Sequence, residues 1–215
     1  MTIMCKADAL AKYRKHYNLD KEEKLLIALR KQHEKTPITV SNQDGLKSKV
    51  CFVLSCPGRE EMIAGKVCQG DTGANLNILL EYLNKQRPDL FPSPVKEEYD
   101  ILNATNVVHF MALDGATEGN AKEIKEGAAS LRRYLEGNAS LKYAILLGNR
   151  AKNATEVFKE KAILCKHLGF QSLNQVKDCD ITDQDGPEAR RIKRIKYLGD
   201  DIIKQIEGKE RNGNR

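Results

Sequence analysis

LKYAILLG, from Leu141 to Gly148, is the clearest buried strand in the chain. A strand with one face in water alternates apolar and polar residues, whereas a continuous apolar run is typical of a strand that is buried on both faces. VCFVLS, from Val50 to Ser55, has the same character. Both stretches therefore predict central strands of a mainly parallel sheet.

Segments with the apolar spacing of amphipathic helices lie between these strands. The alternation of strands and helices predicts an α/β fold, with three α/β/α layers around a mainly parallel four-stranded sheet. We expect the remaining strands within 99–110 and 162–170, and helices over 74–86, 120–135, 150–161 and 190–208.

The domain organisation follows from length and local composition. A chain of 215 residues fits one core with additions at its ends. Helical spacing before Thr36-Pro37 predicts an N-terminal helical extension over residues 1–36. The α/β domain is expected over 37–205, and the polar tail, 206–215, is expected to be disordered.

The apolar content also bounds the cellular setting. No apolar stretch approaches the roughly 20 residues that span a bilayer, and the N-terminal segment lacks the apolar region of a signal peptide. We therefore expect a cytoplasmic protein without membrane contact. Its six cysteines are then expected as reduced thiols. None forms a CxxC pair, so their spacing indicates no zinc or iron–sulfur site.

The formal net charge of +6 is distributed unevenly. Lysines and arginines crowd the N-terminal segment, and RRIKRIK, from Arg190 to Lys196, forms a second cluster. Such clusters are typical of surfaces that bind a phosphate backbone. The solvated helix faces of a charged protein have the same composition. Charge alone therefore leaves both interpretations open.

Polar residues and glycines follow several of the expected strands. In open parallel sheets, ligands bind beyond the carboxyl ends of the strands. This rule predicts one rim that carries residues 55–58, 103–109 and 148–149 together with His167.

LSCPGREEMIAGKVCQGDTGAN, from Leu54 to Asn75, places a Pro-Gly turn and further glycines directly after the first core strand. It is not a Walker loop, because Gly70 is followed by Asp71-Thr72 rather than by Lys and Ser or Thr. The GxG of kinase and dinucleotide loops does not occur in the chain. Nucleotide binding through these common motifs is therefore disfavoured.

This stretch resembles the first motif of the uracil-DNA glycosylase superfamily, approximately GEAPG-x-x-E-D-x-x-G-x-P-F-x-G-x-x-G. The similarity covers roughly residues 50–174, with Asn106 in TNVV, AILLGNRA (144–151) and His167 in KHLG at later motifs. Leu168-Gly169 replaces the usual Pro-Ser after the histidine, so the last motif is weak. In the first motif the family positions match without a gap: Pro57, Gly58, Glu61, Gly65, Gly70 and Gly73.

The resemblance implies a DNA glycosylase that turns a nucleotide out of DNA and hydrolyses the bond between base and sugar, leaving an abasic site. It implies that Asn106 reads the base edge and that His167 stabilises the charge on the departing base. The implied base pocket comprises Cys56, Pro57, Gly58, Cys68 and Asn106. The implied DNA contacts are Gly65, Gly70, Gly73, Arg190, Arg191, Lys193 and Arg194.

The same resemblance bears on partners and cofactors. DNA, duplex or single-stranded, is the expected partner of a monomer that needs neither a metal nor an organic cofactor. The iron–sulfur branch of the family carries paired cysteines near its N-terminus, where this chain has only Cys5. We therefore expect no cluster.

Ser55 and Cys56 depart from the family pattern. The family carries an acidic or amide residue just before Pro57, or one residue earlier, to orient or activate water. Neither a serine nor a cysteine is a competent base at neutral pH without help. Either water is merely positioned at Ser55 while DNA phosphates stabilise an oxocarbenium-like sugar, or the protein binds modified or single-stranded DNA without catalysis.

Two smaller residues bear on the choice of base. Cys68 replaces a base-stacking Phe of the family, and Gly58 occupies the place of a bulky ring in its best-known branch. Both changes would widen the pocket. We therefore expect a pyrimidine with a bulky 5-substituent, such as hypermodified cytosine of phage DNA, and a role in antiviral defence. Uracil repair is the alternative, and action on free nucleotides or nucleosides is a weaker one that the basic termini disfavour.

Each candidate residue also has a purely structural interpretation. Asn106 is compatible with a turn at a strand end, and His167 with a satisfied polar residue near a strand. Glu61 could brace the glycine-rich loop, and Cys56 could be a buried thiol of the core.

Overall fold

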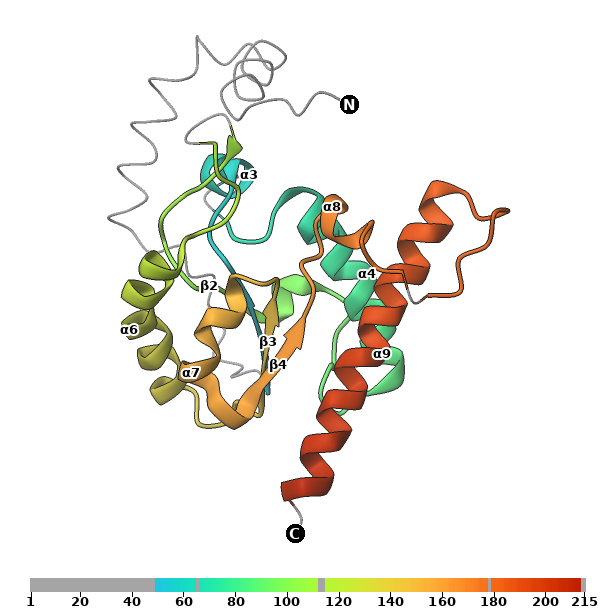
Figure 1. The fold of residues 1–215 in the computed structure, drawn as a ribbon. Coiled ribbons are helices and arrows are strands. Elements are labelled where there is room, and N and C mark those ends of the chain that lie inside the picture. Colours follow the sequence, from blue (N-terminus) through green and yellow to red (C-terminus); the bar gives the residue numbers. More distant parts are fainter. Residues whose placement is uncertain (1–48, 65, 112–114, 178, 214–215) are drawn as a thin grey trace.

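The computed structural model describes residues 49–64, 66–111, 115–177 and 179–213 (Figure 1). These residues form a sheet of four strands in the order β2-β1-β3-β4, and each strand runs parallel to its neighbours. The predicted four-stranded parallel sheet is thereby confirmed. The expected helical extension over 1–36 lies outside the described residues. The strands are β1 (Val50–Leu54), β2 (Asp100–Asn103), β3 (Tyr143–Leu147) and β4 (Ala162–Cys165).

The two continuous apolar stretches form the centre of the sheet. β1 pairs with β2 and β3, and β3 also pairs with β4. Every residue of β1 and β3 is buried. Because successive side chains of a strand point to opposite faces, Phe52 and Ile145 join one apolar cluster, whereas Val53 and Leu146 join the other. Burial on both faces explains why neither stretch alternates.

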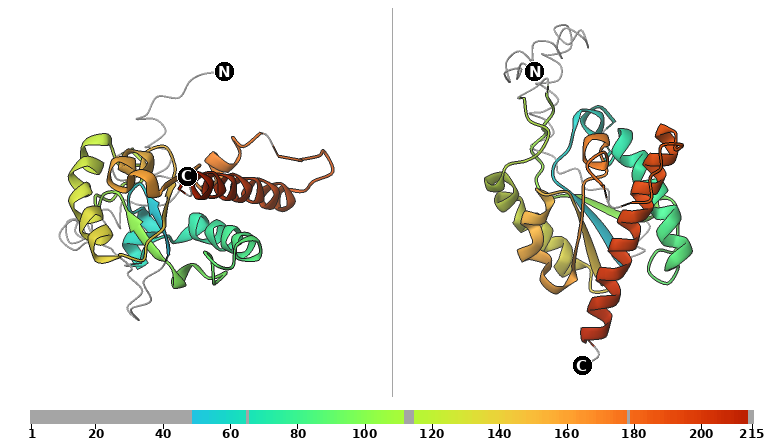
Figure 2. Two further views of the ribbon diagram at one scale, coloured as in Figure 1. Left: turned by 90° about the horizontal axis from the view of Figure 1, so that it is seen from below. Right: turned by 45° about the vertical axis from the view of Figure 1, so that its right-hand side comes forward.

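Helices cover both faces of the sheet and complete three layers (Figure 2). One face packs against α4 (Gly70–Gln86) and α9 (Pro187–Gly213) through their leucine and isoleucine side chains. The other face packs against α6 (Ala121–Gly137) and α7 (Thr155–Phe158). The predicted three-layer α/β/α fold is confirmed.

α9 extends further than the sequence predicts. The tail that we expected to be disordered from residue 206 is helical as far as Gly213, so that prediction is wrong for this part. Ile206 is fully buried, and the Glu210 carboxylate lies 3.0 Å from Nη2 of Arg87. These long-range contacts hold a segment whose own composition is polar.

The connection between β3 and β4 also differs from the prediction. Instead of one helix over 150–161, the chain forms the 3-10 helix η2 (Ala151–Ala154), then α7, and then the 3-10 helix η3 (Lys159–Lys161). Lys159 adopts a φ of +47°, outside the helical region, and α7 ends before it. The break turns the chain back into β4.

Shorter helices follow or precede the strands. They are α3 (Arg59–Ala64), η1 (Lys96–Glu98) and α8 (Phe170–Leu173). α3 and the first turn of α4 lie within the glycine-rich stretch, which is therefore more helical than a bare loop. The start of α6 is set by a capping box between Asn120 and Glu123, in which each side chain accepts a hydrogen bond from the backbone of the other.

Candidate functional site

The carboxyl ends of the strands meet at one edge of the sheet, which we name the carboxyl edge. Leu54 pairs with Asn103 and Leu147 pairs with Cys165, so neighbouring strands end level with each other. The chain segments that follow β1 and β2 stay side by side through backbone hydrogen bonds of 2.8 to 3.1 Å. The rim that the sequence predicts thus forms at this edge.

Ser55 is the first residue after β1, and its hydroxyl oxygen is already engaged. Its Oγ accepts a hydrogen bond from the backbone N–H of Gly119 over 3.0 Å, and the residue is 4% exposed. Close by, Nε2 of His109 lies 2.8 Å from a carboxylate oxygen of Glu123. The first contact attaches the segment before α6 to the end of β1 and gives Ser55 a structural role, and the second attaches the loop after β2 to α6.

Glu61 connects the two ends of the glycine-rich stretch. One carboxylate oxygen accepts from the N–H of Gly58 and the other from the N–H of Gln69, each over 3.0 Å. A Cβ on Gly58 would lie 2.8 Å from the same carboxylate, so Gly58 has a packing reason to lack a side chain. Burial raises the pKa of Glu61 above its usual range. The hydrogen bonds support the bracing role considered for Glu61.

Cys56 is a protonated thiol at neutral pH. Burial raises its pKa to about 12. Its Sγ lies 3.9 Å from the carbonyl oxygen of Thr117, to which it donates a weak hydrogen bond. A nucleophilic cysteine needs a thiolate, so Cys56 is not placed to attack a sugar or a base. It instead links the loop after β1 to the segment before α6.

Cys68 lies inside the core rather than on a cavity wall. Its side chain is 1% exposed and packs in the apolar cluster that contains Leu76, and burial raises its pKa to about 12. The backbone here is unusually close: a Cβ on Gly73 would lie 2.1 Å from the carbonyl oxygen of Cys68. Gly70, with a φ of +62°, makes the turn into α4. Gly65, the other predicted phosphate contact of this stretch, lies outside the described residues.

His167, just after β4, is held in one protonation pattern. The N–H of Gly169 donates to Nδ1 over 2.9 Å, so the proton of the neutral ring is on Nε2. Burial lowers the pKa of His167, whereas the negative charge of Glu118 raises it by a smaller amount. Gly148 has a φ of +99°, and a Cβ there would lie 3.1 Å from Cβ of His167. The close approach of the strand end to the ring thus requires glycine.

A cavity of about 540 Å³, named the His167 cavity, opens beside this ring. Its wall includes Glu118, which the sequence analysis missed because no motif surrounds it. Glu118 lines this cavity together with His167, and its negative charge raises the pKa of both His167 and Cys56. Nε of Arg150 lies 3.9 Å from the Glu118 carboxylate. Other lining residues include Thr117, Asn149, Lys152, Lys166 and Phe170.

Asn106 lies in the loop after β2, on the other half of the carboxyl edge. It is half-buried and makes no hydrogen bond to another described residue. Its amide can therefore serve a ligand. Asn106, Pro57 and Gly58 are not among the residues that line the His167 cavity. The structure joins the two halves of the edge through Cys56, Thr117 and Glu118.

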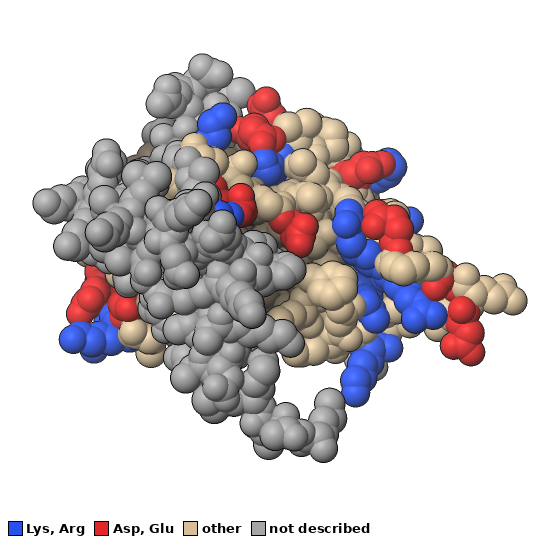
Figure 3. All heavy atoms as spheres, turned by 90° about the horizontal axis from the view of Figure 1, so that it is seen from above, with Lys and Arg blue, Asp and Glu red and all other residues tan. Residues whose placement is uncertain are grey.

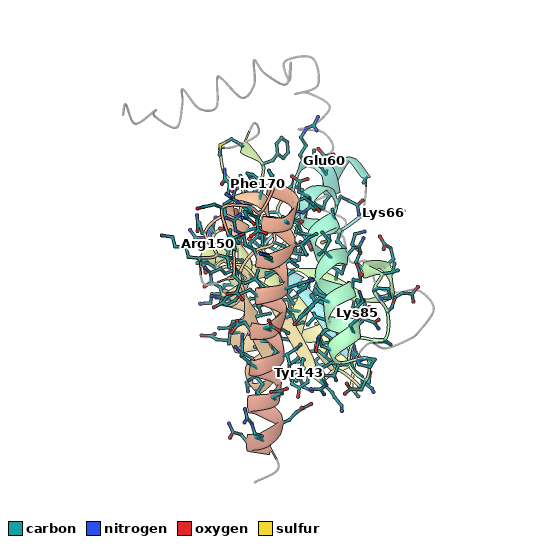
Figure 4. All side chains as sticks on the ribbon, turned by 90° about the vertical axis from the view of Figure 1, so that its right-hand side faces the viewer. Glu60, Lys66, Lys85, Tyr143, Arg150 and Phe170 are labelled. Atoms are coloured by element: carbon teal, nitrogen blue, oxygen red, sulfur yellow. The ribbon has the colours of Figure 1, made fainter. Side chains whose placement is uncertain are left out.

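Phe170 is a second residue that the sequence analysis missed. It begins α8, three positions after His167, and is 67% exposed. Figure 4 shows Phe170 and Glu60 at one end of the molecule and Tyr143, at the start of β3, at the other. Phe170 also lines a second cavity of about 570 Å³, named the arginine cavity, with Asp71, Asn75, Leu173, Asn174, Asp185, Pro187, Glu188, Arg190, Arg191 and Arg194.

The basic residues predicted to contact DNA lie at the start of α9. Three of them, Arg190, Arg191 and Arg194, line the arginine cavity. Lys193 instead pairs with Asp185 at 2.8 Å, an interaction that lowers the pKa of this carboxyl to about 2. Figure 3 views the molecule from the end toward which the strands run, and on the right of this view lysine and arginine side chains gather beside acidic ones. The cluster is therefore only partly neutralised.

The described part of the chain holds no group of three or more His, Cys, Asp and Glu side chains that could bind a metal ion, and no helix of it could cross a membrane. No protein-family model matches the chain, and no curated protein matches it in sequence. The similarity to the uracil-DNA glycosylase superfamily stays a prediction from motifs.

Proposed function

We propose that this protein is a DNA glycosylase that hydrolyses the bond between a turned-out pyrimidine and its sugar, acting first on pyrimidines with a bulky 5-substituent. The observation that carries the proposal is the state of His167: a neutral imidazole with its proton held on Nε2, beside a carboxylate and a cavity at the carboxyl edge. Both groups that bond cleavage requires are thus available together.

The departing base needs a hydrogen-bond donor. When the N-glycosidic bond breaks, its electron pair moves to the base, and negative charge gathers in part on the O2 carbonyl oxygen of the base. Nε2–H of His167 can donate to that oxygen, and a donor that meets charge only as it develops lowers the barrier. Asn106 does not line the His167 cavity, so its amide would have to reach the base edge from outside it, from the loop after β2.

The sugar needs a partner of opposite sign and an attacking water. Glu118 supplies the carboxylate that Ser55 and Cys56 cannot supply. It can stabilise the positive charge on the sugar and accept the proton of the water that attacks the anomeric carbon. The hydroxyl of the water joins the anomeric carbon, and the proton held by Glu118 then passes to the departed base. The products are a neutral free base and an abasic site, and water is the only added reactant.

Cavity size supports a substituted base. A volume of about 540 Å³ falls within the roughly 300–1,000 Å³ typical of ligand sites and is more than a plain pyrimidine ring fills. The small size of Gly58 and Cys68 is weaker support for a substituted base. Gly58 leaves room for the Glu61 carboxylate, and Cys68 packs in the core.

A non-catalytic DNA-binding module is the second candidate. It is favoured by the state of the residues before Pro57, where the hydroxyl oxygen of Ser55 already accepts a hydrogen bond and Cys56 is a protonated thiol. In this case the basic side chains of α9 and the exposed ring of Phe170 would hold a strand without any bond being cleaved.

Alkali-sensitive strand breakage separates the two candidates. Duplex and single-stranded oligonucleotides should carry uracil, 5-hydroxymethylcytosine or its glucosylated form. The proposal expects breaks at a 5-substituted cytosine, and none with a Glu118→Gln variant. Breaks at uracil alone would replace the substrate with that of a repair enzyme. Tight binding without breaks at any base would support the module.

A further inference from the structure

We propose that the arginine cavity binds the nucleotide that neighbours the everted one in the same strand, by its phosphate and by the amino group of its base. This inference rests on the proposed function, which supplies the strand. The arginine cavity is a separate space from the His167 cavity, and Phe170 is the residue that both share.

Two arginines on the α9 wall of the arginine cavity have no carboxylate partner among the described residues. Arg190 donates from Nε to the backbone carbonyl oxygen of Asp185 over 2.8 Å, and Arg194 donates from Nη1 to the side-chain oxygen of Asn174. Within the described residues neither guanidinium pairs with a carboxylate, whereas Arg191 lies 3.4 Å from Glu188. Neutral acceptors thus orient two guanidinium groups whose charge is available to a phosphate.

The same wall has unused donors. Nε of Arg191 and Nε of Arg194 are both shielded from solvent and have no hydrogen-bond partner in the described part of the chain. A buried donor without a partner costs roughly 1–3 kcal/mol. A phosphate oxygen would satisfy such a donor.

The opposite wall carries acceptors from α4. Asn75 is 2% exposed, and its amide N–H₂ donates to the carbonyl oxygen of Leu168 over 2.6 Å. This bond directs Oδ1 the other way, and Oδ1 has no partner among the described residues. Asp71 lies one helical turn earlier on the same side of α4 and also lines the cavity. Two acceptors here suit the exocyclic amine of cytosine, adenine or guanine and disfavour thymine.

Asp71, Asp185 and Glu188 also line the cavity, and a phosphate must avoid them. Lys193 neutralises Asp185 and Arg191 lies beside Glu188, which leaves Asp71 on the α4 side. The phosphate therefore belongs against α9 and the amine against α4. Leu173 and the exposed ring of Phe170 provide apolar surface for the base between them.

Calorimetric titration of the full chain with deoxycytidine monophosphate and thymidine monophosphate tests the inference. We expect the cytidine nucleotide to bind about tenfold more tightly, because the amine of cytosine has two N–H groups, whereas thymine offers one and leaves an acceptor of α4 unsatisfied. An Asn75→Ala variant should remove this preference. An Arg190→Gln, Arg194→Gln double variant should lose binding, whereas Lys204→Gln, on the exposed side of α9, should not. Thermal unfolding of each variant reports whether it folds.

The outcomes are separable from those of the proposed function. Mononucleotide binding needs no bond cleavage, so a protein that excises nothing can still pass this test. Equal binding of both nucleotides and of inorganic phosphate would reduce the cavity to a phosphate site and overturn base recognition. Binding that a saturating oligonucleotide does not displace would assign the cavity to a free nucleotide and overturn the strand assignment.

Discussion

The two halves of the carboxyl edge use their polar groups in opposite ways. After β1 and β2, the protein itself occupies most of them, with Asn106 as the exception: Ser55 holds the segment before α6, and Glu61 binds two backbone N–H groups. After β3 and β4, Nε2 of His167 has no hydrogen-bond partner among the described residues and lies beside an open cavity, and Phe170 is exposed. One half builds the loops, and the other is available to a ligand.

A sequence motif can therefore mark the correct edge of the sheet without marking the side chains that are available to a ligand there. Gly58, Glu61 and Gly73 match the family motif, and each has a packing or bracing role here. Glu118 and Phe170 match no motif, yet they line the His167 cavity. Variants in each half should therefore have different consequences, in activity on one side and in stability on the other.

The largest effect is expected at the His167 cavity. Glu118→Gln removes the charge but keeps the size, and His167→Ala removes the donor to the base. Each should reduce single-turnover base excision by about 10²–10³-fold, the range typical of a lost transition-state donor or general base. Glu118→Gln should leave the midpoint of thermal unfolding nearly unchanged.

Glu126→Gln is the matched control for the loss of one carboxylate. Glu126 lies on the exposed side of α6, where its carboxylate is 3.9 Å from Nζ of Lys122. The side chains of both residues are exposed. The excision rate of Glu126→Gln should equal that of the wild type. A wild-type rate for Glu118→Gln would remove this residue from the mechanism.

The next effect belongs to the β1–β2 half and concerns stability. Glu61→Gln replaces one acceptor by an N–H₂ group that faces a backbone N–H, which should reduce the free energy of unfolding by about 1–3 kcal/mol. Urea unfolding measures it. A variant as stable as the wild type would show that the brace contributes nothing to stability.

A smaller loss of stability is expected for Ser55→Ala. The variant leaves the N–H of Gly119 without its acceptor, which should cost about 1 kcal/mol in the same urea measurement. If excision fell by more than tenfold while stability changed this little, Ser55 would have to act on water directly, and the division of the edge into two roles would fail.

The smallest effect is a shift in titration. Burial lowers the pKa of His167 below 6.5, so the folded protein binds the proton more weakly than the unfolded chain. The stability from this group is fully present above pH 6.5 and is lost as pH falls towards the folded pKa. Because Glu118 raises this pKa, Glu118→Gln should lower it further in an NMR titration. A higher pKa in the variant would contradict the contact.

Much of the fold was predictable because strands that are buried on both faces have continuous apolar sequences. Val50–Leu54 and Tyr143–Leu147 are apolar throughout, and in a sheet such runs fit only the central positions. The rim followed from the parallel direction of the strands. Asn106 and His167 could be placed at that rim for the same reason.

The remaining features depend on contacts between distant parts of the chain. Gly119 binds Ser55 from 64 positions away, and this contact brings Glu118 to the edge. Glu210 binds Arg87, which is 123 positions away in the sequence. This contact stabilises the polar end of α9, for which the local composition predicts disorder. Neither contact leaves a periodic pattern in the sequence. Cys68 was expected in the base pocket, and only the packing of the folded chain shows that its side chain faces the core.

The most direct test of the central claim is mass spectrometry of the small molecules that the protein releases from DNA carrying glucosylated 5-hydroxymethylcytosine. We predict that the wild-type protein releases the free modified base, one molecule for each abasic site, and that the Glu118→Gln variant releases almost none. DNA that stays bound and intact, with no free base from this or any other pyrimidine in the mixture, would contradict the account.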